Sequence, residues 1–428
     1  MKLNVLLFLW VFLIALKAQE DNSFNLVSEN FVADKIYTTS EFNVVTSDDT
    51  NWWASSLSSW ISIEGLSFSS GSGNVTYNIE RNETGENRTG RIFVVEGGWG
   101  DSEVIVDEFN KYLISSLGYS PRGWPNVAFE DYADDSDSII RFAEFNGTDW
   151  DVRDVNNSSG GWGNVDMLHY DLEGNPIISF WDINTRSVKF SRRVGEVWKT
   201  ETVVGNDANV EWKISMAIMP DGHPAIAYAE LVNANISHLK YAYSNGIDWF
   251  FQTVDASSDF ISPSLAFGLD GYPRIAYANE ATGALNFAKY DGGKWKTEIV
   301  PNANGSVIRP SLSIDSNGKS IISYNNTLTD TTSEVKVAKE LADGWNVQLV
   351  RAGGNAGFDT KIINGSDGLP SIVMTDYDNG DLEFARYNGE NWNIKIIDPL
   401  VRARWPSLAY NSKGMPAIAY FDDNSDRL

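Results

Sequence analysis

The chain has 428 residues, no cysteine and a formal net charge of −25 at pH 7. A chain this acidic repels nucleic acids and anionic membrane surfaces, so we exclude both as expected partners. The lack of cysteine excludes disulfides and thiolate-bound metals, whereas a hydrophobic content of 42% is enough to form a sizeable buried core.

The N-terminus has the pattern of an export signal. Lys2 supplies a positive charge, residues 5–16 form an apolar run, and Ala18 is suited to cleavage. The run is too short to span a bilayer. We therefore expect a signal peptide over residues 1–18 and a protein that is secreted, either extracellular or periplasmic, without membrane insertion. The alternative is an N-terminal anchor or a buried helix.

Residues 25–109 alternate in the manner of strands between clusters of Ser, Gly, Asn and Asp, which predicts a small β-sandwich. In order they contain Trp53, the stretch SSWISI at 58–63 and the stretch RTGRIFV at 88–94. This order resembles the BACON domain, an immunoglobulin-like module of secreted Bacteroidetes proteins. The last strand of that family ends in Gln, whereas residues 104–109 read VIVDEF. The resemblance implies a glycan-related function only by association.

A fourteen-residue phrase recurs through residues 113–428. The copy at 264–277 reads SLAFGLDGYPRIAY, and the copy at 407–420 reads SLAYNSKGMPAIAY. The period is about 46–51 residues, and each complete repeat also contains a third strand-like stretch and a fourth that begins at a tryptophan. Four short antiparallel strands in each repeat predict the blades of a β-propeller.

Six repeats are complete, and a seventh stops after its second strand. We therefore expect an all-β protein, in which an immunoglobulin-like β-sandwich precedes a β-propeller of six complete repeats plus a partial seventh. A partial blade leaves an open strand edge, so we interpret the chain as part of a seven- or eight-bladed protein whose sequence continues. The repeat resembles sialidase-like and BNR-type bacterial propellers, although their Asp-box signature S-x-D-x-G-x-T-W is absent. The resemblance implies the fold and lends little to an activity.

The second strand of every repeat is followed by an acidic or amide residue. The simpler interpretation is that these side chains cap the next turn by accepting hydrogen bonds from backbone N–H groups. The alternative is a Ca²⁺ site, because carboxylate and amide oxygens are the ligands that this ion prefers. Its candidate ligands are Asp131, Asp182, Asp376 and Asp422. The remaining members of the set are Glu230, Asn279 and Asn326.

The segments that enter the first strand connect one blade to the next, so we expect them on the same face as these acids. Exposed aromatic side chains stack on sugars, and Arg or Lys pairs with carboxylate or sulfate groups. The alternative is that the aromatic side chains hold neighbouring blades together. The segments also carry Phe260 and Phe358, and the candidate ligand-binding residues are Trp162, Trp212, Lys213, Arg309, Arg404 and Trp405.

One histidine could take part in catalysis. His169 occupies the position that holds Ala266 in another repeat, and Tyr170 follows it. Some propeller polysaccharide lyases use a histidine and a tyrosine as base and acid, which makes this pair the catalytic candidate. The alternative is a histidine that only fills a gap. The nucleophile motifs G-x-S-x-G and H-E-x-x-H and the P-loop are absent from the sequence.

Together these features predict a carbohydrate-binding or adhesion protein. We expect it to recognise an extracellular polysaccharide or glycoprotein glycan of acidic character through one face of the propeller. The first alternative is an enzyme, either a polysaccharide lyase or a glycoside hydrolase, that uses the same face. The second is a scaffold for protein contacts.

Overall fold

The computed structural model is built of β-strands throughout the residues that it describes. These are 24–27, 38–46, 51–56, 61–64, 68–70, 72–79, 92–96, 114–134, 137–146, 150–155, 161–162, 167–205, 210–233, 236–256, 260–301, 305–329, 331–399 and 402–422. The chain divides into two compact units, residues 1–105 and 106–428. Within the described residues, no helix has the length and apolar character needed to cross a membrane.

The described strands of the first unit form two antiparallel sheets. One has the strand order β1-β2-β6-β4 and the other β5-β3-β7. The packing of these sheets and residues 1–18 lie outside the described part, so the immunoglobulin-like sandwich, the BACON resemblance and the signal peptide stay predictions. The strands are β1 (Phe24–Val27), β2 (Thr38–Thr46), β3 (Asn51–Ser56), β4 (Ile61–Glu64), β5 (Phe68–Ser70), β6 (Gly73–Ile79) and β7 (Ile92–Glu96).

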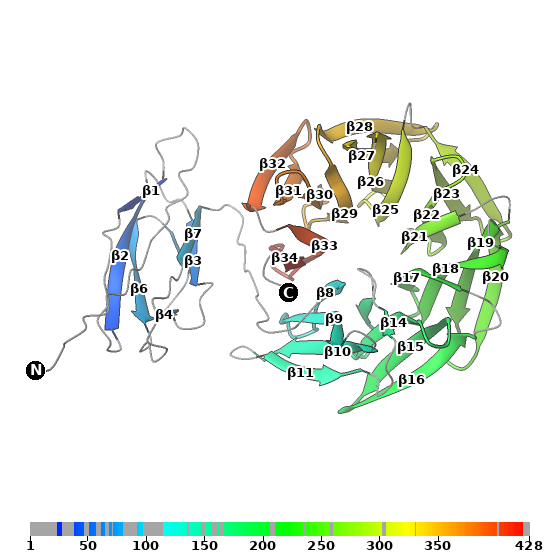
Figure 1. Cartoon of the computed structure of the whole chain (residues 1–428), viewed down its shortest axis with the longest axis horizontal. Helices are drawn as coiled ribbons and strands as arrows, with labels where there is room; N and C mark the ends of the chain where they lie inside the picture. The colour runs from blue at the N-terminus through cyan, green and yellow to red at the C-terminus, as the bar shows by residue number, and fades with distance from the viewer. Residues whose placement is uncertain are drawn as a thin grey trace, which may run out of the picture. The chain divides into compact units, whose positions relative to one another are not determined.

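The second unit is a ring of sheets around a common centre (Figure 1), with strand one of each sheet innermost. In blade 2 the inner strand is divided, because β12 and β13 both pair with β14. Blade 1 consists of β8 (Ser115–Tyr119), β9 (Pro125–Asp134), β10 (Asp137–Phe145) and β11 (Trp150–Asp154). Blade 2 consists of β12 (Gly161–Trp162), β13 (Leu168–Tyr170), β14 (Pro176–Asp182), β15 (Ser187–Val194) and β16 (Val197–Val204). Blade 3 consists of β17 (Val210–Ile218), β18 (Pro224–Asn233), β19 (Ile236–Ser244) and β20 (Trp249–Asp255).

The next three blades follow the same four-stranded plan, and a two-stranded sheet comes after them. Blade 4 consists of β21 (Phe260–Phe267), β22 (Pro273–Asn279), β23 (Ala284–Tyr290) and β24 (Trp295–Val300). Blade 5 consists of β25 (Ser306–Ile314), β26 (Ser320–Thr329), β27 (Thr332–Glu340) and β28 (Trp345–Ala352). Blade 6 consists of β29 (Ala356–Asn364), β30 (Pro370–Asp376), β31 (Asp381–Tyr387) and β32 (Trp392–Asp398). The two-stranded unit 7 consists of β33 (Ala403–Tyr410) and β34 (Pro416–Asp422).

Unit 7 closes the ring. Strand β33 lies against β29 of blade 6 on one side and against β8 of blade 1 on the other. Phe421 and Ala419 of unit 7 are buried in one cluster with Val127 and Phe129 of blade 1. The structure therefore confirms the predicted all-β propeller with six complete blades, and the partial seventh repeat occupies the place between the last blade and the first.

The glycine of the recurring phrase lies in the hairpin between strands one and two. Its φ is between 74° and 87° in all seven repeats, for example 78° at Gly271. Residues with a side chain rarely adopt this conformation, which explains why the glycine recurs. The hairpin is closed by the N–H of Gly271, which donates to the carbonyl of Gly268 at 2.9 Å.

The serine that opens the phrase links each blade to the next. In five repeats its hydroxyl accepts a hydrogen bond from a backbone N–H of the following blade, as Ser264 does from Leu312 at 2.9 Å. The two looser copies of the phrase have Met167 and Lys361 at this position. The recurrence of the serine is thus explained by contacts between repeats. The serines are Ser116, Ser215, Ser264, Ser311 and Ser407.

The tryptophan that begins strand four also binds the preceding blade. Trp295 donates its indole N–H to Gln252 Oε1 at 2.8 Å, and its ring meets that of Tyr241 edge-on at 5.3 Å. The indoles of Trp249 and Trp345 donate in the same way, to Glu201 and Glu298. These tryptophans therefore stabilise the outer part of the ring.

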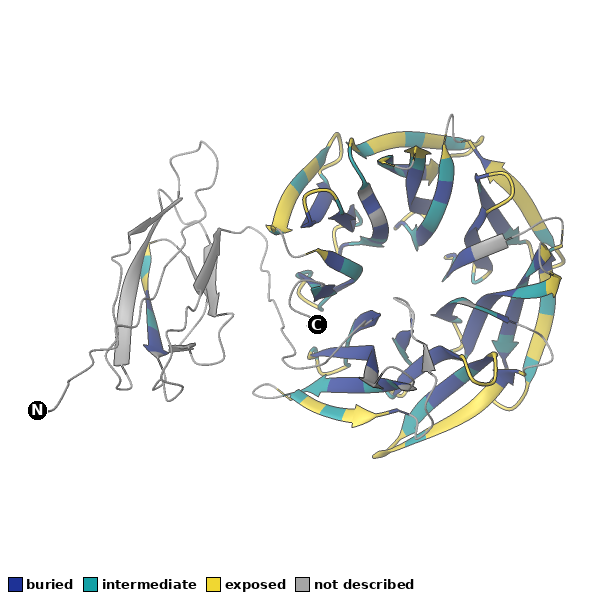
Figure 2. Ribbon diagram, viewed as in Figure 1, coloured by how far each residue is buried: buried dark blue, intermediate teal, exposed yellow. Residues whose placement is uncertain are grey.

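The hydrophobic core lies between neighbouring blades. Figure 2 shows the inner strands buried and the outer strands alternating between exposed and half-buried residues. In the layer between blades 3 and 4, Ala217 and Ala227 pack with Leu265, Ile275 and Tyr277. Small residues recur on the inner strands because these strands crowd toward the centre of the ring.

Candidate functional site

The predicted ligand-binding and cation-binding residues share one end of the ring. Strand one begins opposite the residue at which strand two ends, as shown by the register pairs Ala356 with Asp376 and Ala403 with Asp422. We call this end the entry rim, and the opposite end, which carries the phrase glycines, the hairpin rim. In the other repeats the predicted acid or amide also lies opposite a residue at or near the start of strand one: Gly161 with Asp182, Val210 with Glu230, Phe260 with Asn279 and Val307 with Asn326.

At the entry rim, strand one contains a bulge just before the phrase serine. The register shifts between Ile308 and Ser311, and again between Arg404 and Ser407. The residue two places before the serine then has positive φ, 48° at Arg309 and 45° at Trp405. A residue before proline normally adopts an extended conformation. Such strain costs about 1–3 kcal/mol and tends to occur at functional sites.

This bulge position varies from repeat to repeat while the phrase around it recurs. The near-symmetry of the ring brings equivalent positions to the same rim, so the bulges form a variable collar on a constant frame. Variation on a rigid frame is typical of surfaces that bind ligands. In blades 3 to 6 and unit 7 the residues are Lys213, Ser262, Arg309, Asp359 and Trp405.

Three cationic side chains lie at this collar or beside it. Burial and the positive charge of Arg309 lower the pKa of Lys213 to about 8, although Glu280 and Glu211 partly offset them. Burial also lowers the pKa of Arg309, and the charge of Arg404 acts in the same direction. Cations from blades 3 and 5 and unit 7 are thus close enough to repel one another, in a chain whose net charge is −25.

Aromatic rings flank the third cation. The guanidinium carbon of Arg404 lies 5.9 Å from the ring centroid of Tyr377 and 5.9 Å from that of Trp405. Cation–π contacts of this kind hold an arginine in a defined place. Trp405 is itself partly buried against the cluster between unit 7 and blade 1. This packing is compatible with the blade-holding alternative, and the ligand-binding role of Trp405 stays a prediction.

The predicted stacking role of the other aromatic residues stays a prediction. The backbones of Trp162, Trp212, Phe260 and Phe358 lie at the entry rim. Their side chains are outside the described residues.

The acids after strand two cap turns and pair with cations. Asp182 Oδ1 accepts from the N–H groups of Asn184 and Thr185 at 3.0 and 3.1 Å. Asp376 Oδ1 accepts from Asp378 N–H at 3.0 Å, while its Oδ2 lies 3.0 Å from Arg351. These contacts are those of the turn-capping interpretation.

No metal cluster accompanies these acids in the described part of the chain. Asp131 pairs with Arg141 at 2.7 Å, and Asp422 lies opposite Ala403 at the end of β34. No group of three or more His, Cys, Asp or Glu residues that could hold a metal ion occurs among the described residues. The Ca²⁺ site stays a prediction.

The catalytic candidates are separated from the cations. Tyr170 lies opposite Pro176, whereas Trp162 at the other end of blade 2 lies opposite Trp181. The Tyr170 hydroxyl accepts a hydrogen bond from Asn126 at 2.7 Å, and burial raises its pKa. His169 precedes it in the same strand, and successive strand residues point to opposite faces. The two side chains are thus expected on opposite faces of the strand, and the catalytic role of this pair stays a prediction.

Sequence reasoning missed two residues at the entry rim, Asp359 and Tyr377. Aligning the repeats on the phrase would have revealed Asp359, because it occupies the position of Arg309 and Trp405. No repeat pattern marks Tyr377, whose contact with Arg404 depends on how blade 6 meets unit 7.

Comparisons with known proteins assign no family to the chain. No family model matches the chain, and no curated protein does. Similar solved structures include a protein of unknown function from Dyadobacter fermentans, with 11% identity, a TM-score of 0.47, and coverage of 68% of this chain and 95% of that one. The GH93 α-L-arabinofuranosidase of Fusarium graminearum has 12% identity, a TM-score of 0.44 and coverages of 59% and 90%. A Hadza microbial sialidase has 13% identity, a TM-score of 0.41 and coverages of 72% and 75%. The neighbours thus include a sialidase propeller, and at these values they assign neither a family nor an activity.

Proposed function

We propose that this protein binds an anionic polysaccharide at the entry rim, through Lys213, Arg309 and Arg404. The observation that carries the proposal is the electrostatic coupling of these three residues: the charge of Arg309 lowers the pKa of Lys213, and the charge of Arg404 lowers the pKa of Arg309. Carboxylate or sulfate groups of a ligand would offset their mutual repulsion and accept charge-assisted hydrogen bonds. Trp162 and Trp212 are proposed to stack on the sugar rings.

The proposal favours binding over catalysis. The hydroxyl of Tyr170 is engaged by Asn126 at 2.7 Å, and it lies toward the hairpin rim rather than beside the cations. Arg and Lys recognise acidic groups without needing a base nearby. Secretion, as predicted from residues 1–18, belongs to the same proposal, because acidic polysaccharides are extracellular polymers.

The test measures binding of the full chain to three probes by isothermal titration calorimetry. The probes are polygalacturonate, which carries carboxylates, dextran sulfate, which carries sulfates, and uncharged dextran. We expect binding to at least one polyanion and none to dextran. Arg309→Gln should weaken that binding by about tenfold to a hundredfold, because a charge-assisted hydrogen bond contributes roughly 1.5–3 kcal/mol.

Arg122→Gln is the matched control. Arg122 is exposed in the hairpin of blade 1, at the opposite rim, and its replacement removes the same charge. Equal losses for Arg122→Gln and Arg309→Gln would mean that the polyanion binds by overall charge and not at the collar. Failure of the wild-type protein to bind either polyanion would refute the proposal, and release of shortened or unsaturated products would indicate an enzyme instead.

A further inference from the structure

We infer that Asp359 is a positioning residue of the proposed anion site, which orients Arg309 and holds the bulge that carries Trp405. The inference rests on the proposed function, because it concerns how the cation that meets the ligand is held. It explains why a carboxylate, that of Asp359, is present at a site that we expect to bind anions.

The two oxygens of Asp359 contact two different neighbours. Oδ1 forms an ion pair with Arg309 Nη1, and Oδ2 accepts a hydrogen bond from the backbone N–H of Trp405 at 3.3 Å. Asp359 lies in β29 of blade 6, between β25 and β33, which carry the other two residues. One side chain therefore spans three consecutive units of the ring.

Burial makes this carboxylate dependent on its partners. Asp359 is 6% exposed, whereas the Arg309 side chain keeps 24% of its surface in contact with solvent. A buried carboxylate without partners is costly, so Asp359 favours the conformation in which both contacts are made. Arg309 is thus held from its buried side, and its partly exposed side faces solvent, where a ligand would arrive.

Asp359 also contacts two residues whose backbone is strained. Arg309 and Trp405 are both non-glycine residues with positive φ before a proline, and both are bound by Asp359. Strained conformations persist only where their surroundings hold them. Asp359 supplies such contacts to both bulges at once.

If Asp359 acts only through its charge, Asp359→Asn should strengthen binding; if it orients Arg309, the same substitution should weaken binding. Asp359→Asn removes a negative charge beside the site, so simple electrostatics predicts tighter binding of a polyanion. The asparagine carbonyl can still accept from Trp405 N–H, but its amide group cannot pair with Arg309. If Asp359 orients Arg309, the variant should bind more weakly despite its more favourable charge.

The experiment measures the affinity of the full chain for the polyanion that binds in the wild type. We expect Asp359→Asn to weaken binding about fivefold or more, and the Arg309→Gln, Asp359→Asn double variant to bind about as weakly as Arg309→Gln alone, since the residues act as one unit. Equal or tighter binding by Asp359→Asn, or additive losses in the double variant, would overturn the inference.

Asp315→Asn is the control for the loss of a buried carboxylate. Asp315 is 4% exposed, pairs with Lys339 at 3.1 Å and lies at the hairpin rim. We expect it to lower the melting temperature without changing polyanion affinity. A matching loss of affinity in this variant would mean that general destabilisation explains the effect of Asp359→Asn.

A second measurement uses the wild-type protein, so it does not depend on whether the Asp359→Asn variant folds. In crystals of the wild-type protein soaked with glucose 6-sulfate, we expect the sulfate on Arg309 while the Arg309–Asp359 pair remains. An Arg309 that leaves Asp359 to reach the sulfate would overturn the positioning role. Absence of polyanion binding by the wild type would refute the proposed function itself, so the two failures are distinguishable.

Discussion

The hydroxyl of Ser407 accepts a hydrogen bond of 2.9 Å from the backbone N–H of Leu117, although 290 residues separate the two in sequence. The bond joins unit 7 to blade 1 and so closes the ring. It repeats, between the ends of the propeller, the contact that Ser264 makes between blades 4 and 5. The two-stranded unit therefore interlocks with its neighbour by the same device as a complete blade.

Replacing this serine should destabilise the propeller. Ser407→Ala leaves the N–H of the buried Leu117 without its acceptor, and we expect the free energy of unfolding to fall by about 1–3 kcal/mol in urea titrations. Ser412→Ala, in the exposed hairpin of the same unit, should change it by less than about 0.5 kcal/mol. Identical unfolding curves for the two variants would show that the closing bond contributes nothing.

The strand-four tryptophans offer a test of the outer contacts. Trp295→Phe keeps a ring against Tyr241 but loses the N–H donated to Gln252, so we expect a loss of about 0.5–1.5 kcal/mol. Trp295→Ala loses both contacts and should cost about 3 kcal/mol. The check is urea unfolding of both variants. Equal losses for phenylalanine and alanine would argue against a contribution from the ring contact.

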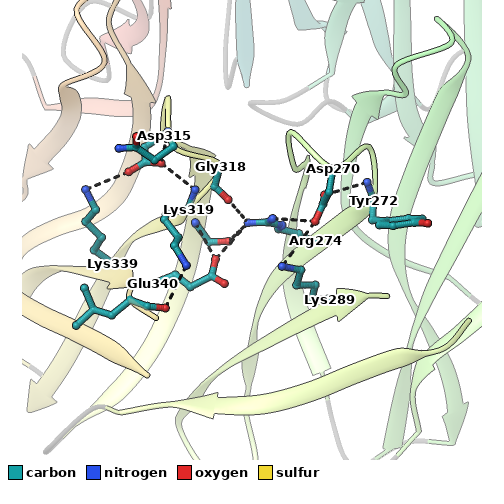
Figure 3. A network of polar contacts seen from close by, with 12 residues as sticks. Asp270, Tyr272, Arg274, Lys289, Asp315, Gly318, Lys319, Lys339 and Glu340 are labelled. Atoms are coloured by element: carbon teal, nitrogen blue, oxygen red, sulfur yellow. Dashed lines mark hydrogen bonds and ion pairs between the residues drawn. The ribbon is translucent and has the colours of Figure 1, made fainter. Parts of the chain in front are cut away.

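A buried arginine connects blades 4 and 5 at the hairpin rim (Figure 3). Arg274 Nη1 donates to the carbonyl of Gly318 at 2.7 Å and to Glu340 at 3.2 Å, and Nη2 lies 3.3 Å from Asp270. Arg274→Met should lower the free energy of unfolding by about 3 kcal/mol, because Glu340 is left without this partner. Lys289→Met removes a solvent-accessible cation 3.7 Å from the same Asp270, and should cost less than about 1 kcal/mol. Comparable losses would contradict the assigned difference between buried and exposed pairs.

The lowered pKa of Lys213 predicts how stability and polyanion binding depend on pH. Its pKa is lowered from 10.5 to about 8, chiefly by burial, so between pH 8 and 10.5 the folded protein has released this proton while the unfolded chain retains it. The unfolded state then binds more protons, and the contribution of Lys213 to stability rises with pH across this window. The cost of burying its charge is fully present below pH 8.

The affinity for a polyanion should fall as the pH rises, whereas the contribution of Lys213 to stability rises. As Lys213 loses its charge above pH 8, we expect affinity for the polyanion to fall between pH 7 and pH 9. Lys213→Arg keeps its charge throughout this range and should show a smaller fall. Calorimetric titrations at both pH values provide the check. The same pH dependence in the two proteins would exclude Lys213 as the titrating group.

Local features of the sequence determined the blade plan. Three features act within one repeat: the period of the phrase, the glycine that requires positive φ and the tryptophan that begins strand four. Each could therefore be recognised from the sequence alone. The shared rim of Asp376 and Ala356 was also predictable, because the ends of an antiparallel hairpin must lie together. Strand alternation also predicts that the side chains of His169 and Tyr170 point to opposite faces of their strand.

Only the tertiary structure decided which repeats meet and through which atoms. The pairing of Ser407 with Leu117, and of Asp359 with both Arg309 and Trp405, joins residues of different repeats. Such contacts depend on the angle between blades and on closure of the whole ring, which no single repeat encodes. The sequence therefore placed the candidate cations on a common rim, whereas the proposed site depends on how the closed ring relates their repeats.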